Sequence, residues 1–360
     1  MTKRGLAHFA QSSEQNVPVP FLRPHYSQTS MSWDRILQFD SANGEPLRRR
    51  IDALFAQQRA TWPALCEGEA ALQHLDTKTL TSGGDWIVVQ ANPARQRSTH
   101  AKTDTQSIAA RPCFLCPQNM PPEERGVAFE NLVILPNPYP ILPLHCTIAD
   151  CKHRPQQLIG SVDTLLRLAA EIGPDLAALY NGPRCGASAP DHLHFQAASA
   201  AGIPILTQLA PHAEGHCRAA HTSFGRSMLL FASPRAADVQ SDIEQSMASL
   251  RRLLQPDDER VVVQVDDEPM LNLLIHFNAG RYVAVLFPRR AHRPARYFAK
   301  GRDHLAVSPA ILEMSGLLVT TDPDHFERID AATARSIYEQ VSLEPSSFER
   351  LVSQMTGFST

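Results

Sequence analysis

The segment Gly186–Gln196 reads GASAPDHLHFQ and decides how the rest of the chain is interpreted. His192 and His194 are two positions apart, so on an extended strand both imidazoles lie on one face and can reach one site. Gln196 continues the same face. The turn before the strand offers backbone amides and the Ser188 hydroxyl to an anion. A His-x-His pair also occurs by chance, but this combination predicts a strand that carries a polar, anion-binding site.

Outward from this segment, short strands alternate with longer helices. The expected strands cover residues 85–90, 131–135, 145–149, 195–198, 260–265, 271–277 and 282–287. The expected helices cover residues 46–65, 161–180 with an interruption near Gly173-Pro174, and 241–254, and residues 106–111 are expected to form a loop. This pattern predicts an α+β fold in which a helical amino-terminal extension, residues 1–80, precedes two similar halves, residues 81–205 and 206–360.

The composition is that of a soluble, folded protein. Of the 360 residues, 43% are hydrophobic and 20% are charged, so intrinsic disorder is excluded. The formal net charge of −3 provides no overall attraction to nucleic acid or to an anionic membrane. The longest uncharged apolar stretch, residues 131–149, contains four prolines and cannot be a spanning helix. The amino terminus shows no secretory signal, which leads us to expect a cytoplasmic protein.

The seven cysteines are an odd number, which argues against a disulfide framework in a chain of this kind. Two of them form the motif Cys113-x-x-Cys116. Such a motif is either a redox pair or half of a zinc site, and the βαβ context of a redox pair is missing. Zinc needs two further ligands, and two histidines would complete a Cys₂His₂ set.

The His-x-His-x-Gln pattern of residues 192–196 resembles the transferase branch of the histidine triad superfamily. In that branch the second histidine attacks an α-phosphate and carries the nucleotide as a phosphoramidate, so the resemblance gives His194 the role of nucleophile. Imidazole suits this role because it is unprotonated at neutral pH and is a competent leaving group. Gln196 replaces the third histidine of the hydrolases, so it can hold a phosphate oxygen but cannot protonate a leaving group. The site therefore favours transfer over hydrolysis, with Ser188 as a third candidate catalytic residue.

Four upstream segments resemble galactose-1-phosphate uridylyltransferase in order and approximate spacing. They are residues 85–89 (DWIVV), 93–97 (PARQR), 113–116 (CFLC) and 135–139 (LPNPY). The resemblance implies a structural zinc ion that fixes the strand carrying the nucleophile. The ligands it implies are Cys113, Cys116, His153 and His192. His145 or Cys151 could replace His153, and a chain without any metal is the alternative.

The resemblance also implies which residues contact the substrate. Arg95 and Arg97 resemble the phosphate-contacting arginines of the family, and Asn137 resembles the asparagine near the nucleotide. Gly186 opens the turn that would hold phosphate. Surface salt bridges are the alternative role for the two arginines.

The chain departs from the uridylyltransferases by one additional residue between Ser188 and His192. Its HLHFQ sequence is closer to the GDP-hexose phosphorylases, and diadenosine tetraphosphate phosphorylases share its Gly-Ala-Ser-x-Pro turn. The resemblance covers residues 80–200 well and 260–320 weakly. It therefore implies two histidine-triad-like halves, the second of them degenerate, and it indicates a reaction class better than a substrate.

A third feature is residues 281–302, which contain seven basic residues and no acidic one. Guanidinium groups bind phosphate oxygens bidentately. Arg289, Arg290 and Arg293 are therefore candidates for holding the phosphate of an acceptor. A solvated basic face or an RNA-binding patch is the alternative.

Together these features predict a nucleotidyltransferase or phosphorylase. Its donor would be a nucleoside diphosphate sugar or a dinucleoside polyphosphate, which leaves its nucleotide on His194. Its acceptor would be phosphate or a sugar phosphate. No membrane partner is expected, and nucleic acid is not favoured as a partner. A nucleotide hydrolase and a non-catalytic nucleotide- or RNA-binding protein are the alternatives.

Overall fold

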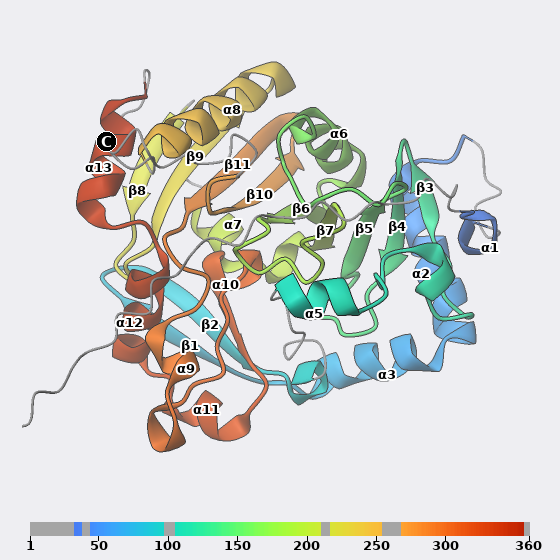
Figure 1. The fold of residues 1–360 in the computed structure, drawn as a ribbon, viewed down its shortest axis with the longest axis horizontal. Coiled ribbons are helices and arrows are strands. Elements are labelled where there is room, and N and C mark those ends of the chain that lie inside the picture. The colour runs from blue at the N-terminus through green and yellow to red at the C-terminus, as the bar shows by residue number, and fades with distance from the viewer. Residues whose placement is uncertain (1–31, 38–43, 97–104, 210–216, 254–267, 356–360) are drawn as a thin grey trace, which may run out of the picture. The chain divides into compact units, whose positions relative to one another are not determined.

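Two β-sheets organise the chain, and the computed structural model describes residues 32–37, 44–96, 105–209, 217–253 and 268–355 (Figure 1). Within these residues, a nine-stranded sheet has every neighbouring pair antiparallel. Its order is β3 (Val127–Phe129), β4 (Leu132–Pro136), β5 (Cys146–Asp150), β7 (His194–Ser199), β6 (Leu176–Asn181), β10 (Leu271–Asn278), β11 (Arg281–Pro288), β9 (Ser227–Ser233) and β8 (Cys217–His221). A three-stranded sheet contains β1 (Asp76–Ser82), β2 (Asp85–Ala91) and β12 (Leu317–Thr320), with β12 parallel to β2.

Helices cover the sheets. They are α1 (Asp34–Leu37), α2 (Leu47–Thr61), α3 (Pro63–Ala71), α5 (Thr105–Ala110), α6 (Val162–Ile172), α7 (Pro204–Leu209), α8 (Ala236–Leu253), α9 (Ala295–Phe298), α10 (Ile311–Met314), α11 (Pro323–Arg328), α12 (Ala331–Val341) and α13 (Pro345–Ser353). Short 3₁₀ turns lie at Leu72–His74, Pro93–Arg95, Pro117–Asn119, Ala200–Gly202 and Gly301–Asp303. Among the residues that the structure describes, no helix is long and apolar enough to cross a membrane.

The alternation of side chains along β7 decides which face carries the polar residues. Leu193, Phe195 and Ala197 belong to a core that also contains residues of α2, α6 and α8. His194 and Gln196 point to the opposite face, because successive residues of a strand alternate. Ala198 on that face packs in a second core with residues of β2, β12 and α10. Figure 1 shows α6 and α8 along one side of the large sheet and β1 and β2 on the other.

The structure confirms the α+β class and most of the expected strands, and it corrects three local expectations. The helix expected at residues 161–180 ends at Ile172, and Leu176–Asn181 is a buried strand between β7 and β10. Pro174 has no amide hydrogen to continue the helix, and the apolar run after it is fully buried in the sheet. Residues 105–110 form α5 instead of a loop, and the helix expected at 46–65 divides at Trp62 into α2 and α3. The strand expected at 260–265 lies outside the described residues.

The strands before and after residue 206 join edge to edge where β6 pairs with β10, with Asn181 opposite Asn272. The side-chain oxygen of Asn181 accepts hydrogen bonds from Asn272 Nδ2 (2.8 Å) and from the Ile311 amide (2.8 Å). The segment that leads into α10 therefore lies against the turn between β6 and β7. At its closest point, a Cβ placed on Gly186 would lie 2.7 Å from the Cβ of Ala310.

Gly186→Ala tests this contact, because Gly186 combines a left-handed backbone (φ 104°) with the close approach of Ala310. Gly280→Ala is the matched control, since Gly280 has a φ of 74° and nothing within 4 Å of a new Cβ. The backbone strain costs roughly 1–2 kcal/mol at either position. We expect Gly186→Ala to lower the free energy of unfolding by about 1–3 kcal/mol more than the control, measured by chemical denaturation. Equal losses would show that the packing on Ala310 contributes nothing.

Candidate functional site

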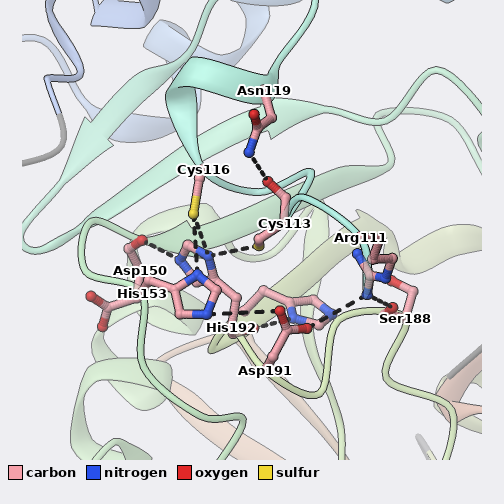
Figure 2. A network of polar contacts seen from close by, with 10 residues as sticks. Arg111, Cys113, Cys116, Asn119, Asp150, His153, Ser188, Asp191 and His192 are labelled. Atoms are coloured by element: carbon pink, nitrogen blue, oxygen red, sulfur yellow. Dashed lines mark hydrogen bonds and ion pairs between the residues drawn. The ribbon is translucent and has the colours of Figure 1, made fainter. Parts of the chain in front are cut away.

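Four side chains of the types that bind metal ions lie close together near the start of β7. Cys113, Cys116, His153 and His192 have their ligand atoms within 4.8 Å of one another (Figure 2). The Cys113 sulfur lies 3.3 Å from Nδ1 of His192, and the Cys116 sulfur lies 3.1 Å from Nδ1 of His153. Two thiols and two imidazoles form the donor set of a tetrahedral zinc site. Among the described residues, the sequence alternatives His145 and Cys151 are not part of this cluster.

Backbone contacts and burial prepare the cluster for a cation. Nε2 of His192 donates to the carbonyl oxygen of Asp150 (2.8 Å), so Nδ1 keeps its lone pair and faces the thiols. Burial lowers the pKa of His192 to about 4, which keeps the ring neutral. Burial also raises the pKa of the Cys113 thiol to about 12. A bound cation would reverse this last effect, because it stabilises the thiolate.

The loop that carries the cysteines is tied to the segment Ser32–Leu37. Trp33 is buried against this loop and donates from Nε1 to the carbonyl oxygen of Cys151 (3.1 Å). The Arg35 guanidinium donates to several carbonyl oxygens of the loop that follows Cys116. These are the oxygens of Pro117, Met120, Pro121 and Pro122, at 2.9–3.3 Å. The cysteines are therefore held on a loop whose backbone has defined partners.

A charged connection joins this cluster to the turn before β7 (Figure 2). The Asp191 carboxylate lies 3.7 Å from Nε2 of His153 and 3.5 Å from Nη2 of Arg111. The same Nη2 donates to the carbonyl oxygen of Ser188 (3.1 Å). The metal-ligand cluster and the turn that would hold phosphate are thus one connected network.

His194 has one ring nitrogen engaged and the other open. Its Nδ1 donates to the carbonyl oxygen of His192 (2.8 Å), so the lone pair is on Nε2. That Nε2 atom is buried and has no hydrogen-bond partner among the described residues. Burial lowers the pKa of His194, which keeps the ring neutral and nucleophilic. A neutral imidazole with an open lone pair is the arrangement that nucleophilic attack requires.

Gln156 fixes the backbone at the start of β7. Its Nε2 donates to the carbonyl oxygens of Asn181 and His194 (2.9 Å each), and its Oε1 accepts from the His194 amide (2.8 Å). Gln156 is fully buried. It therefore bridges the facing ends of β6 and β7 and holds the His194 backbone in place.

Three other predicted substrate residues, Gln196, Arg95 and Asn137, have polar contacts within the loop between β4 and β5. Gln196 is half-buried, and its Oε1 lies 3.3 Å from Nε2 of His145. Arg95 donates to the carbonyl oxygen of Tyr139, and Asn137 accepts from the Tyr139 amide (2.9 Å). Arg95 and Asn137 thus support the loop between β4 and β5. Arg97 lies outside the described residues.

The basic segment does not present all of its arginines to a ligand. Arg289 is fully buried, and each of its guanidinium nitrogens donates to a protein oxygen. The acceptors are Asn272 Oδ1 and the carbonyl oxygens of Ala291, His292, Pro309 and Val341. Arg290 pairs with Glu344 and donates to two carbonyl oxygens at the end of α12. Arg289 therefore has a structural role in the interior, whereas Arg290 lies in an exposed ion pair, and the expectation that they bind an acceptor phosphate stays a prediction.

Arg293 is different. It is half-buried, donates from Nε to the Ser308 hydroxyl (3.0 Å), and lies 4.2 Å above the centre of the Tyr297 ring. Ser308 is two residues before Ala310, which contacts the Gly186 turn. Arg293 therefore stays a candidate for binding an anion.

Sequence reasoning missed five residues that hold His194 or the turn before β7 in place, namely Arg111, Gln156, Asn181, Asp191 and Asn272. Arg111 and Asp191 each stand within two positions of a predicted metal ligand, so a search for charged neighbours of the ligands would have found them. The other three are isolated amides in the sequence. Their partners lie on strands that are distant along the chain, so no local pattern marks them.

Two family models match parts of the chain. Residues 54–199 match the family model "Domain of unknown function (DUF4922)", and residues 259–359 match the model "GDPGP1-like, C-terminal domain". No curated protein sequence matches the chain significantly.

The fold is shared with a solved phosphorylase. The crystal structure of yeast Ap4A phosphorylase Apa2 is 14% identical, covers 83% of this chain and 95% of its own, and superposes with a TM-score of 0.55. The same enzyme in complex with Ap4A is 13% identical, with coverages of 83% and 98% and a TM-score of 0.55. The GDPGP1-like model over residues 259–359 and the fold shared with Ap4A phosphorylase bear out the resemblance to this group of phosphorylases.

Arg289→Met and Arg293→Met separate a structural arginine from a ligand-binding one. Arg289→Met leaves several buried oxygens without a donor, so we expect it to lower the free energy of unfolding by about 3 kcal/mol or more. Arg293→Met removes a partly exposed charge and should change that free energy by less than about 1 kcal/mol. Urea denaturation followed by circular dichroism measures both. A stable Arg289→Met variant that binds phosphate poorly would restore Arg289 to the substrate site.

Proposed function

We propose that this chain is a nucleotidyltransferase of the phosphorylase type, with Nε2 of His194 as the atom that carries the nucleotide. The observation that supports this most directly is the buried Nε2, which has a lone pair and no protein partner among the described residues. A buried polar atom without a partner is costly and calls for an explanation, which a bound phosphate would supply. The shared fold with Ap4A phosphorylase supports the same reading.

The reaction follows from the hydrogen bonds around the ring. Nε2 of His194 attacks the α-phosphorus of the donor, the bond from phosphorus to the bridging oxygen breaks, and the remainder of the donor leaves with that oxygen. The ring becomes positive in this step, and the hydrogen bond from Nδ1 to the His192 carbonyl oxygen stabilises the charge. An oxygen of the acceptor phosphate then attacks the same phosphorus, and the P–N bond breaks to restore the neutral imidazole.

The substrates that this site suits are nucleotides joined through phosphoanhydride bonds. The yeast relative was solved in complex with AMP and with Ap4A. By analogy, we propose a dinucleoside polyphosphate or a nucleoside diphosphate sugar as the donor, and phosphate or a sugar phosphate as the acceptor. The backbone amides of the Gly186 turn, with Ser188, would hold donor phosphate oxygens. Arg293 would bind the acceptor, because it lies beside the segment that packs on this turn.

Zn²⁺ fits the Cys113, Cys116, His153 and His192 cluster, and we propose that it is structural. When bound, the ion would supply charge stabilisation to the two thiolates and a rigid link between the cysteine loop and His192. Four protein ligands leave no open position for substrate. The link would act on the reaction through position alone, since His192 accepts the Nδ1–H of His194 through its carbonyl oxygen.

His194→Ala should abolish the covalent intermediate while the protein stays folded, because it removes the attacking atom. We expect turnover to fall at least about a thousand-fold. Incubation of the wild type with a labelled dinucleoside polyphosphate, without acceptor, should give an acid-labile and base-stable adduct that mass spectrometry maps to residue 194. His276→Ala, which removes a half-buried histidine bonded to the Pro174 carbonyl oxygen, is the control.

The outcomes distinguish the alternatives. Release of nucleotide monophosphate without acceptor would identify a hydrolase. Tight nucleotide binding with neither adduct nor turnover would identify a binding protein. A His194→Ala variant that keeps a tenth of wild-type turnover contradicts the proposal.

Metal analysis tests the cluster. We expect about one Zn²⁺ per chain in protein purified without added zinc, and a loss of both metal and thermal stability in Cys113→Ser, because the metal contributes folding free energy. Cys151→Ser is the matched control, since Cys151 is a partly buried neighbour outside the cluster. Equal metal loss in the control, or a fully stable metal-free wild type, would rule out the proposed ligand set.

A further inference from the structure

We infer that His145 is a positioning residue that fixes which end of the Gln196 side-chain amide faces the phosphate on His194. The inference rests on the proposed function, because it assigns a task to the residue beside the nucleophile. It begins from a contact between two side chains: Nε2 of His145 lies 3.3 Å from Oε1 of Gln196.

The backbone determines the tautomer of His145. The Ile141 amide donates to its Nδ1 (3.1 Å), and an amide nitrogen can only donate. Nδ1 therefore carries the lone pair, and in a neutral ring the hydrogen is on Nε2. The ring is buried, and burial lowers the pKa of His145 to about 3, so this single form persists at neutral pH.

The tautomer in turn orients the amide. An Nε2–H group needs an acceptor, so Gln196 presents its oxygen to His145 and turns its NH₂ group away. Gln196 shares a face of β7 with His194, two residues apart. The NH₂ group can then donate to a phosphate oxygen on the nucleophile. The reversed amide would present an oxygen to that anion, which is repulsive.

The loop around His145 holds this arrangement in place. The carbonyl oxygen of His145 accepts from the Asn137 amide (2.8 Å), which closes the connection between β4 and β5. Leu144, directly before it, has a φ of 54°, in the left-handed region that non-glycine residues rarely adopt. Strain of this kind is typically kept where a side chain must be aimed.

A double-mutant cycle of His145→Phe and Gln196→Ala tests the inference. Each single variant loses a hydrogen bond from Gln196 to a charged phosphate, so we expect each to lower kcat about 10-fold to 100-fold. In the Gln196→Ala background, His145→Phe should cost less than about 2-fold, because its effect passes through Gln196. If the two losses multiply, His145 acts on activity by another route and the inference is wrong.

Nuclear magnetic resonance of wild-type protein with ¹⁵N-labelled histidine gives a second readout that needs neither turnover nor a folded variant. We expect His145 to show a protonated Nε2 and an unprotonated Nδ1, and to keep this state from neutral pH down to about pH 5. The opposite tautomer, or a ring that titrates near its ordinary pKa, overturns the inference. Failure of the proposed function would appear separately, as the absence of a labelled adduct on His194.

Discussion

Buried polar groups must find hydrogen-bond partners, and this requirement orients the three imidazoles on which the site depends. In each ring one nitrogen forms a hydrogen bond with the backbone, and this bond determines whether the other nitrogen carries a lone pair or a hydrogen. The Asp150 carbonyl leaves Nδ1 of His192 for the metal-ligand cluster, and the His192 carbonyl leaves Nε2 of His194 open. The Ile141 amide assigns the hydrogen of His145 to Gln196. Three different roles thus arise from one chemical group, because the backbone partner differs.

The site also depends on the pairing of β6 with β10, where the strands before and after residue 206 meet in the large sheet. Arg289 lies beside this pairing as a buried cation that donates to Asn272 and to carbonyl oxygens near α10 and α12. Asn272 in turn donates to Asn181 and to the carbonyl oxygen of Cys185, at the start of the Gly186 turn. The second half therefore contributes to the site through contacts that hold this turn. This role explains why Arg289, which belongs to a basic segment of the sequence, is buried in the structure.

The sequence was sufficient for the features that are local. The pattern at residues 192–196 located the start of β7, and the Cys113-x-x-Cys116 spacing marked half of the metal-ligand cluster. The expectation that both histidines lie on one strand and reach one site was wrong, because β7 begins at His194 and His192 lies in the bend before it, among the metal-ligand residues. The sequence also failed where the outcome depends on distant partners. The run after Pro174 is apolar enough for either a helix or a strand, and only its place between β7 and β10 decides. The carbonyl and carboxylate partners of Arg289 and Arg290 also lie far along the chain, and no local pattern shows them. His145 is visible in the sequence, but its tautomer depends on a loop that no pattern describes.

The separations along the chain have a consequence for how the site forms during synthesis. The Cys113 sulfur can contact His192 only after 79 further residues have been synthesised. The side-chain oxygen of Asn181 can accept from the Ile311 amide only after 130 further residues. The metal-ligand cluster can therefore assemble while the second half is still being translated. The turn at Gly186 gains its support only after α10 has left the ribosome. A chain arrested between these two points would carry all four residues of the metal-ligand cluster beside a Gly186 turn that still lacks its contact with Ala310, so the cluster can form before the turn is complete.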